Sequence, residues 1–258
     1  GCDNTFLASG DDGTLTCTAN ENNFHTVGGR QAGSMFGLNY RVELYGQFGE
    51  AAGIARSTGA TDHTGVQTGM AMDREAYMYG IRIGKAFKNV AYKPSVTLWY
   101  DYLSGTSDED LANGKWSSFD TMYDTGHKYY GLQDLFLGIG GGGEKGTQGL
   151  GLQDLAVKVK MNPVAGWTLK VDYHYFYTAE GVNASPHVSD TGSTGAQNDG
   201  TFLGNELDVT AIHKMNSATK VIIGYSNFNA AQTFRRIRNA TTGANDANWA
   251  YVQFDVKF

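Results

Sequence analysis

Residues 36–48 read FGLNYRVELYGQF, and apolar side chains alternate with polar ones along this stretch. Leu38, Val42 and Leu44 fall on one side of an extended chain, whereas Arg41 and Glu43 fall on the other. Successive side chains of a β-strand point to opposite faces, so this period of two predicts a strand with one apolar and one polar face. A half-buried strand of a soluble domain shows the same pattern, so this stretch alone leaves both settings open.

The alternation recurs along the chain. A weaker strand is predicted at 24–31, and further strands are predicted at 74–88, 93–104, 151–162, 167–178, 203–215, 220–228 and 248–258. Most of these stretches have about 10–13 residues, enough to cross a bilayer when tilted, whereas strands of soluble domains usually have about 5–6. The pattern predicts an all-β fold, a transmembrane antiparallel β-barrel with about nine strands in this chain.

Composition agrees with a membrane barrel. The 258 residues include 35 Gly, 15 Tyr and 13 Phe but only 3 Pro, and no apolar run approaches the roughly 18 residues of a membrane helix. Glycine-rich strands and aromatic girdles are typical of outer-membrane barrels. A net charge of −6 argues against a nucleic-acid partner.

The predicted connections alternate in length. Short ones fall near 32–35, 89–92, 162–166 and 216–219, and long ones near 50–73, 105–150, 179–201 and 229–247. Outer-membrane barrels have short periplasmic turns and long extracellular loops, so we expect the C-terminus in the periplasm. The last strand ends on Phe258, which resembles the signal that the barrel-assembly machinery recognises.

The whole chain, residues 1–258, is expected to form one barrel region, with residues 1–22 as an exposed loop. Single-chain bacterial barrels have even strand numbers, so an odd count indicates either that an N-terminal part of the barrel lies outside this chain or that the count is off by one. Cys2 and Cys17 lie close together in a polar stretch. They predict a local disulfide in an oxidising compartment; two free thiols, or lipidation at Cys2, are the alternatives.

The polar phase of the strands supplies the predicted lumen-lining residues: Arg30, Arg41, Glu43, Arg74, Arg82, Asp101, Lys158, Lys170, Asp172, His174, Glu206 and Asp208. Rings of Arg and Lys select anions in channels. The signs here are nearly balanced, and opposite charges on neighbouring strands pair. The arginines therefore either form a conduction ladder or pair with carboxylates and stiffen the wall.

Other constellations favour plain structural roles. Asp172 and His174 share one strand face, but no nucleophile accompanies them, so wall residues are favoured over catalysts. The acidic run 108–110 lacks the ligand spacing of a dedicated Ca²⁺ loop. Arg235, Arg236 and Arg238 either bind lipopolysaccharide or an anionic substrate or are solvated. No metal site, c-type haem motif or phosphate-binding loop is predicted, and the glycine-rich stretch between two GLQDL copies, at 131–135 and 151–155, is interpreted as a flexible insertion.

Several stretches resemble the alginate-export family of outer-membrane barrels. They are 118–131 (SFDTMYDTGHKYYG), 100–105 (YDYLSG), 172–174 (DYH), 204–208 (GNELD) and 224–226 (GYS), in matching order from about Phe24 to the C-terminus. The first is the most specific, and its loop-motif residues are Phe119, Asp120, Gly126, His127, Lys128, Tyr129 and Tyr130. The resemblance implies a barrel of about 18 strands with a charged, polar lumen, and family members include a secretion channel for the anionic polysaccharide alginate.

The sequence therefore predicts a passive outer-membrane channel without cofactor, passing ions, small solutes or an anionic polysaccharide. Its expected partners are outer-membrane lipid and lipopolysaccharide, the barrel-assembly machinery and a polysaccharide or small-solute substrate. A structural or interaction barrel that scaffolds an envelope or surface complex is the first alternative. A barrel enzyme is the least favoured, because no nucleophile–base set is visible.

Overall fold

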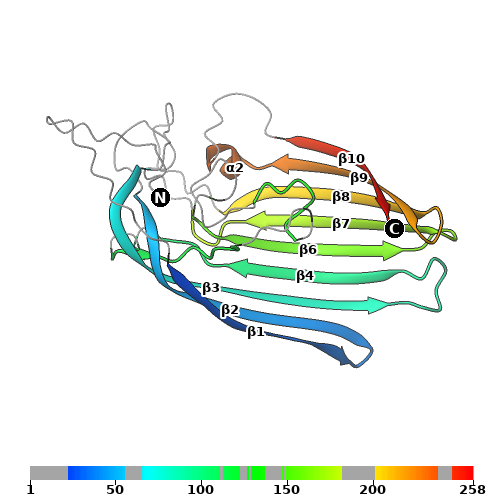
Figure 1. Cartoon of the computed structure of the whole chain (residues 1–258), viewed down its shortest axis with the longest axis horizontal. Coiled ribbons are helices and arrows are strands. Elements are labelled where there is room, and N and C mark those ends of the chain that lie inside the picture. Colours follow the sequence, from blue (N-terminus) through cyan, green and yellow to red (C-terminus); the bar gives the residue numbers. More distant parts are fainter. Residues whose placement is uncertain are drawn as a thin grey trace.

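The computed structural model describes residues 23–55, 66–107, 109–110, 113–122, 127, 129–136, 147, 149–181, 201–237 and 246–257. One antiparallel sheet dominates, with strand order β1-β2-β3-β4-β6-β7-β8-β9-β10 (Figure 1). Each strand therefore pairs with the next long strand in the sequence. The sheet is open, with β1 and β10 at its edges.

The strands match the alternating stretches of the sequence. Their bounds are β1 Phe24–Met35, β2 Leu38–Ala55, β3 Val66–Ala86, β4 Ser95–Leu103, β6 Leu152–Met161, β7 Trp167–Tyr177, β8 Phe202–Lys214, β9 Thr219–Ala230 and β10 Ala247–Val256. A two-residue strand, β5 (Lys115–Trp116), pairs in parallel with β3. The one described helix of several residues is α2 (Gln232–Ile237). The all-β fold and its nine long strands are confirmed.

Two predicted connections are wrong in extent. Residues 32–35 belong to β1, and the turn is the pair Phe36–Gly37, with φ of 52° and 73°. Positive φ at both central residues fits the tight hairpin turns whose twist matches the strands. The long connection expected at 50–73 is shorter, because β2 continues to Ala55 and β3 starts at Val66. Small residues and glycine there hide the alternation.

Short and long connections gather at opposite ends of the sheet (Figure 1). The short ones are 36–37, 87–94, 162–166 and 215–218. At the other end lie the connections 56–65, 104–151, 178–201 and 231–246, the last of which contains α2. We call these the short-turn end and the long-connection end.

The sheet has one apolar and one polar face, and burial is inverted relative to a soluble protein. Leu44, Ile81, Leu98 and Phe254 are examples of apolar side chains that are exposed on the apolar face. Charged residues in the middle of the opposite face, such as Glu43, Arg82 and Asp154, are buried. The apolar stripes do not pack inside a two-sheet core, which is what a soluble sandwich requires. A face of this kind fits hydrocarbon rather than water.

Tyrosines line the apolar face near the long-connection end. Tyr77 and Tyr79 of β3 both stack on Tyr102 of β4, with ring centroids 5.8 and 5.0 Å apart. Further along the sheet, Tyr177 packs on Phe202, 5.2 Å between centroids. Such amphipathic rings gather where a membrane meets water. Among the described residues, no helix is long and apolar enough to cross a membrane.

An apolar core covers the polar face near the long-connection end. Strand residues Leu103, Leu152, Phe176, Leu203 and Phe228 pack there against side chains of the long connections. The connections contribute Phe119, Tyr130, Phe136, Leu150, Phe234 and Ile237. The polar face is therefore apolar at one end and charged further down, a division that alternation alone did not predict.

Candidate functional site

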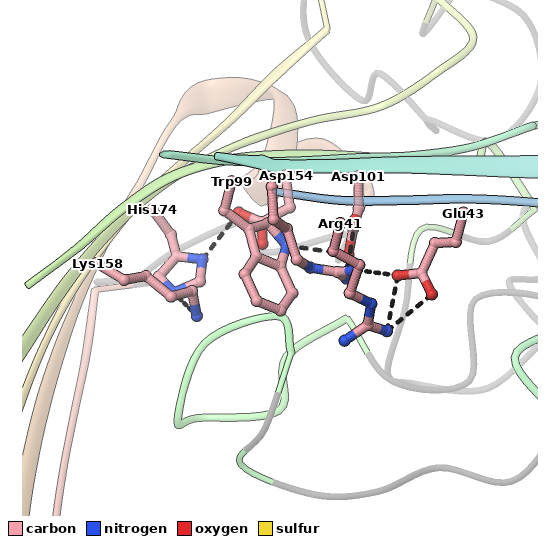
Figure 2. Close-up of polar contacts among 8 residues, drawn as sticks. Arg41, Glu43, Trp99, Asp101, Asp154, Lys158 and His174 are labelled. Carbon is pink, nitrogen blue, oxygen red and sulfur yellow. Dashed lines mark hydrogen bonds and ion pairs between the residues drawn. The ribbon is translucent and has the colours of Figure 1, made fainter. Parts of the chain in front are cut away.

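A chain of ion pairs crosses the middle of the polar face (Figure 2). The Arg82 guanidinium of β3 contacts Glu43 on β2 and donates to both oxygens of Asp101 on β4, at 3.1 and 2.9 Å. Arg41 donates to Glu43 from the other side, at 2.7 Å. Arg41 and Arg82 lie directly opposite each other in the register, so Glu43 bridges two like charges that otherwise repel.

Trp99 of β4 continues this chain of ion pairs toward β6. We call the whole group the belt, and its members are Arg41, Glu43, Arg82, Trp99, Asp101, Asp154, Lys158, Asp172 and His174. Its indole Nε1 donates to Asp101 at 3.0 Å. The Arg82 guanidinium carbon lies 3.6 Å from the Trp99 ring centroid, and the Lys158 ammonium lies 4.7 Å from it. Both cations are attracted by the ring quadrupole. Trp99 thus links the arginine cluster to the next group of charges.

His174 of β7 is the centre of that next group. Its Nδ1 lies 2.8 Å from Asp154 Oδ1, and its Nε2 lies 3.2 Å from the Lys158 ammonium (Figure 2). An ammonium only donates, so Nε2 accepts and Nδ1 donates to Asp154. Asp172, on the same strand face as His174, pairs with Lys158 at 3.4 Å. The His174 ring is fully buried, which disfavours acid–base work on a solute.

The acidic pair of β8 holds part of the connection 104–151. Backbone amides of Leu132 and Gln133 donate to Asp208 Oδ2 and Glu206 Oε1, at 3.2 and 3.1 Å. Ser226 of β9 donates to the same Glu206 oxygen at 2.8 Å. The Gln133 side-chain amide also donates to the carbonyl of Ala247 in β10, at 3.0 Å. We call residues 129–136 the inward segment, because they lie against the polar face.

The first part of the same connection is fixed at the other side of the sheet. Gln47 of β2 exchanges hydrogen bonds with the backbone of Asp120, and Arg74 of β3 donates to the Ser118 carbonyl at 3.1 Å. The Arg74 guanidinium also lies over the Phe24 ring, 4.1 Å from its centroid. The connection is therefore anchored to β2 and β3 at one side and to β8, β9 and β10 at the other, so it crosses the polar face.

The loop motif packs against that face where it is described. Phe119 and Tyr130 are buried in the apolar core, and Tyr129 lies 6.1 Å from Trp99 between ring centroids. His127 lies 2.6 Å from the Leu132 carbonyl through Nδ1 and stacks on Trp249 of β10 at 4.7 Å. Burial raises the pKa of the Tyr130 phenol well above its ordinary value, so its hydroxyl stays protonated. Gly126 and Lys128 lie outside the described residues.

Exposure differs between the two signs of charge in the belt. The carboxylate side chains of Glu43, Asp101 and Asp154 are 6%, 1% and 0% exposed. The side chain of Arg41 is 27% exposed and that of Lys158 is 17% exposed, whereas the Arg82 side chain between the carboxylates is only 7% exposed. Among the acidic belt members, Asp172 is the open one, at 25%. The charge that the belt exposes to a solute is therefore more positive than the sum of its formal charges.

Other predicted residues lie apart from the belt. Arg30 of β1 is exposed and, among the described residues, forms no hydrogen bond or ion pair with the belt, although it stands opposite Glu43 in the register. Lys170 is exposed toward the short-turn end, where Lys160 and Lys170 stand directly opposite each other. Arg235 pairs with Asp246 at 3.6 Å. Asp110 accepts the Ser107 amide and hydroxyl, and the described part of the chain contains no group of three or more potential metal ligands. Cys2, Cys17, Asp108, Arg238 and Phe258 lie outside the described residues, as does the Arg236 side chain.

The sequence did not single out Gln47, Trp99, Gln133 or Ser226. The sequence contained a usable signal for Trp99. This residue occupies an inward position of β4, whereas an indole in a membrane barrel ordinarily lies on the lipid-facing side. The family model described as alginate export matches residues 5–248 of this chain. A comparison with curated proteins gives no match.

Proposed function

The chain belongs to the alginate export family of outer-membrane transport channels, and from this premise we propose that the polar face lines a passage through which anionic solutes, an acidic polysaccharide among them, cross passively. The observation that carries the proposal is the inverted burial of the sheet. An exposed apolar face with buried charges on its other side suits a wall between lipid and a polar interior. A β-barrel is the architecture consistent with the family.

The charges accessible in the belt support an anionic cargo. Arg41 and Lys158 keep part of their side chains open, while the belt carboxylates of Glu43, Asp101 and Asp154 are covered. Toward the short-turn end, Lys160 and Lys170 add two exposed ammonium groups on the same face. Basic side chains lining a pore favour anions. Passage of small inorganic ions follows from the same electrostatics.

The inward segment narrows the proposed passage beside the belt. Tyr129 approaches Trp99, and the backbone at 132–133 reaches β8. A solute that follows the polar face meets this segment next to the exposed cations. The belt and the segment together are thus the proposed constriction.

The alternating connections support a sidedness for the protein. We propose that the long-connection end faces the cell exterior and that the short-turn end and the C-terminus face the periplasm, because outer-membrane barrels share this arrangement. Tyr102 and its neighbours then mark the outer lipid boundary, where lipopolysaccharide is the neighbouring lipid. Recognition of β10, the last strand of this chain, by the barrel-assembly machinery belongs to the same proposal.

A sealed structural barrel is the second candidate, and one observation favours it. The connection 104–151 is hydrogen-bonded to both sides of the sheet and covers part of the belt. A barrel closed in this way would present its long connections as a binding surface for an envelope or surface complex.

Planar-bilayer recording distinguishes the two candidates. We expect discrete conductance steps and a reversal potential that indicates anion preference in a salt gradient. Arg41→Gln combined with Lys158→Gln should reduce that preference, whereas Lys85→Gln, which removes a lysine from the apolar phase of β3, should leave it unchanged. Absence of steps from correctly folded protein would reject the channel and favour the sealed barrel.

A further inference from the structure

We propose that Glu206 and Asp208 are positioning residues for transport, acting as a latch that holds the inward segment in its narrowing position. This inference rests on the proposed channel function. The two carboxylates occupy alternate positions of β8 and therefore share one face. Each accepts a backbone amide from one of two consecutive residues, Leu132 and Gln133. The bonded groups are main-chain donors, so the interaction fixes the path of the segment itself.

The negative charges of Glu206 and Asp208 are only partly neutralised by the groups around them. On β7, His174 stands opposite Glu206 and Asp172 stands opposite Asp208; on β9, Phe228 and Ser226 take these positions. His174 Nε2 lies 3.9 Å from Asp208 Oδ2 and already accepts from Lys158. His174 also contacts Asp154 and Lys158 of β6, so these two charged side chains are further neighbours of the latch.

Two carboxylate oxygens of the latch, Glu206 Oε2 and Asp208 Oδ1, are buried and accept no hydrogen bond from an N–H or O–H group of the described residues. The two carboxylates also face each other as like charges. A buried charge lacking full compensation is costly. Water can solvate both carboxylates if the segment leaves, so the closed arrangement has a competitor that relieves this cost. The hydrogen bonds of the closed arrangement therefore compete with solvation of the two carboxylates, and the inward segment can exchange between a bound and a released position.

Glycine at position 131 is required for the closed arrangement. Its φ is +82°, and a Cβ placed there would lie 2.6 Å from the Glu206 carboxylate. Only a residue without a side chain lets the main chain approach the acidic pair this closely. Gly131→Ala therefore obstructs the latch without changing any charge.

The first experiment measures release of the segment directly, by trypsin cleavage within 104–151 of the protein folded in liposomes. Glu206→Gln/Asp208→Asn keeps the side-chain shapes but removes the charge that strengthens the amide bonds. Cleavage tracks the released population, so its rate should rise about tenfold, equivalent to about 1.4 kcal/mol. Gly131→Ala should give a rise of the same order. Asp255→Asn removes a carboxylate that pairs with Lys220 near the short-turn end, away from the segment, and it should leave the rate unchanged.

The second experiment measures single-channel conductance of the same variants. Latch variants should conduct more than the natural protein, whereas Asp255→Asn should conduct like it. Heat-modifiable electrophoretic mobility reports that each variant is folded. Unchanged cleavage in both folded latch variants, or an equal rise in Asp255→Asn, would overturn the latch. Increased cleavage in a protein that never conducts would retain the latch and reject the channel.

Discussion

Gln47 and Asp120 are joined by a reciprocal pair of hydrogen bonds, although they lie 73 positions apart in the sequence. The Gln47 amide donates to the Asp120 carbonyl at 2.7 Å, and its carbonyl accepts the Asp120 amide at 2.9 Å. The buried Gln47 side chain thus satisfies both backbone hydrogen-bonding groups of Asp120, as a paired strand would. It fixes the connection 104–151 at the side of the sheet opposite Glu206.

Gln47→Leu should loosen this part of the connection. Burying the Asp120 amide and carbonyl without partners costs about 1–3 kcal/mol, which the connection avoids by moving away. We expect faster trypsin cleavage at Lys115 in the folded protein. Gln47→Glu retains the acceptor and loses the donor, so it should fall between the natural protein and Gln47→Leu. A cleavage rate unaffected by Gln47→Leu would show that other contacts fix this part.

Arg82→Leu should strongly destabilise the folded sheet. It leaves Glu43 and Asp101 buried beside each other without their shared cation. Removing one partner of a buried ion pair costs about 3–5 kcal/mol. Urea unfolding from vesicles measures the loss.

Lys115→Gln is the matched control for Arg82→Leu. The hydrogen bond that the Lys115 ammonium donates to Glu75 raises the pKa of Lys115, but both side chains of this pair are largely open to solvent. Exposed pairs contribute little, so this variant should unfold like the natural protein. Equal losses in the two variants would contradict a special role for Arg82.

Ile81→Arg tests the environment of the apolar face. Ile81 is exposed in the middle of β3, with Val42 and Tyr100 as its cross-strand neighbours. An arginine facing the bilayer midplane costs about 2–4 kcal/mol and one near the interface about 0–1. We expect inefficient folding into vesicles for Ile81→Arg and nearly normal folding for Val256→Arg, at the end of β10. Equal folding of both would argue against lipid contact at Ile81.

Gly37→Ala should weaken the first hairpin. Gly37 has φ of +73°, and a side chain in this left-handed region costs roughly 1–2 kcal/mol. Gly46→Ala in β2 is the control, because its added Cβ meets open space. Urea unfolding should show a loss for Gly37→Ala alone. A loss confined to Gly46→Ala would reverse the assignment of strain.

The strands could be predicted because their signal is local. Alternation along β2 or β7 reflects the two faces of a single strand, and it needs no knowledge of the partner strand. The prediction failed at strand ends where small residues such as Gly and Ala predominate, as at 50–55 and 32–35. There the continuing ladder of hydrogen bonds, rather than side-chain pattern, extends the strand.

The inward segment could not be predicted because its contacts join distant parts of the sequence. Gln133 reaches Ala247 across 114 positions, and no local pattern indicates that pairing. A partial signal was present in Phe176 and Phe228, two aromatic residues on the inward phase where charges were expected. Their function is to hold Phe136 and the helix residue Phe234, 4.5 and 4.9 Å away between ring centroids.

The repeated pentapeptide GLQDL has a consequence for how the protein can change by mutation. One copy, at 131–135, contributes to the latch, and the other, at 151–155, forms the start of β6. An in-frame deletion of residues 131–150 joins Tyr130 to the second copy and leaves every long strand intact. A single genetic event can therefore remove the obstruction while conserving the wall, which offers evolution, or an engineer, a short route to a wider variant.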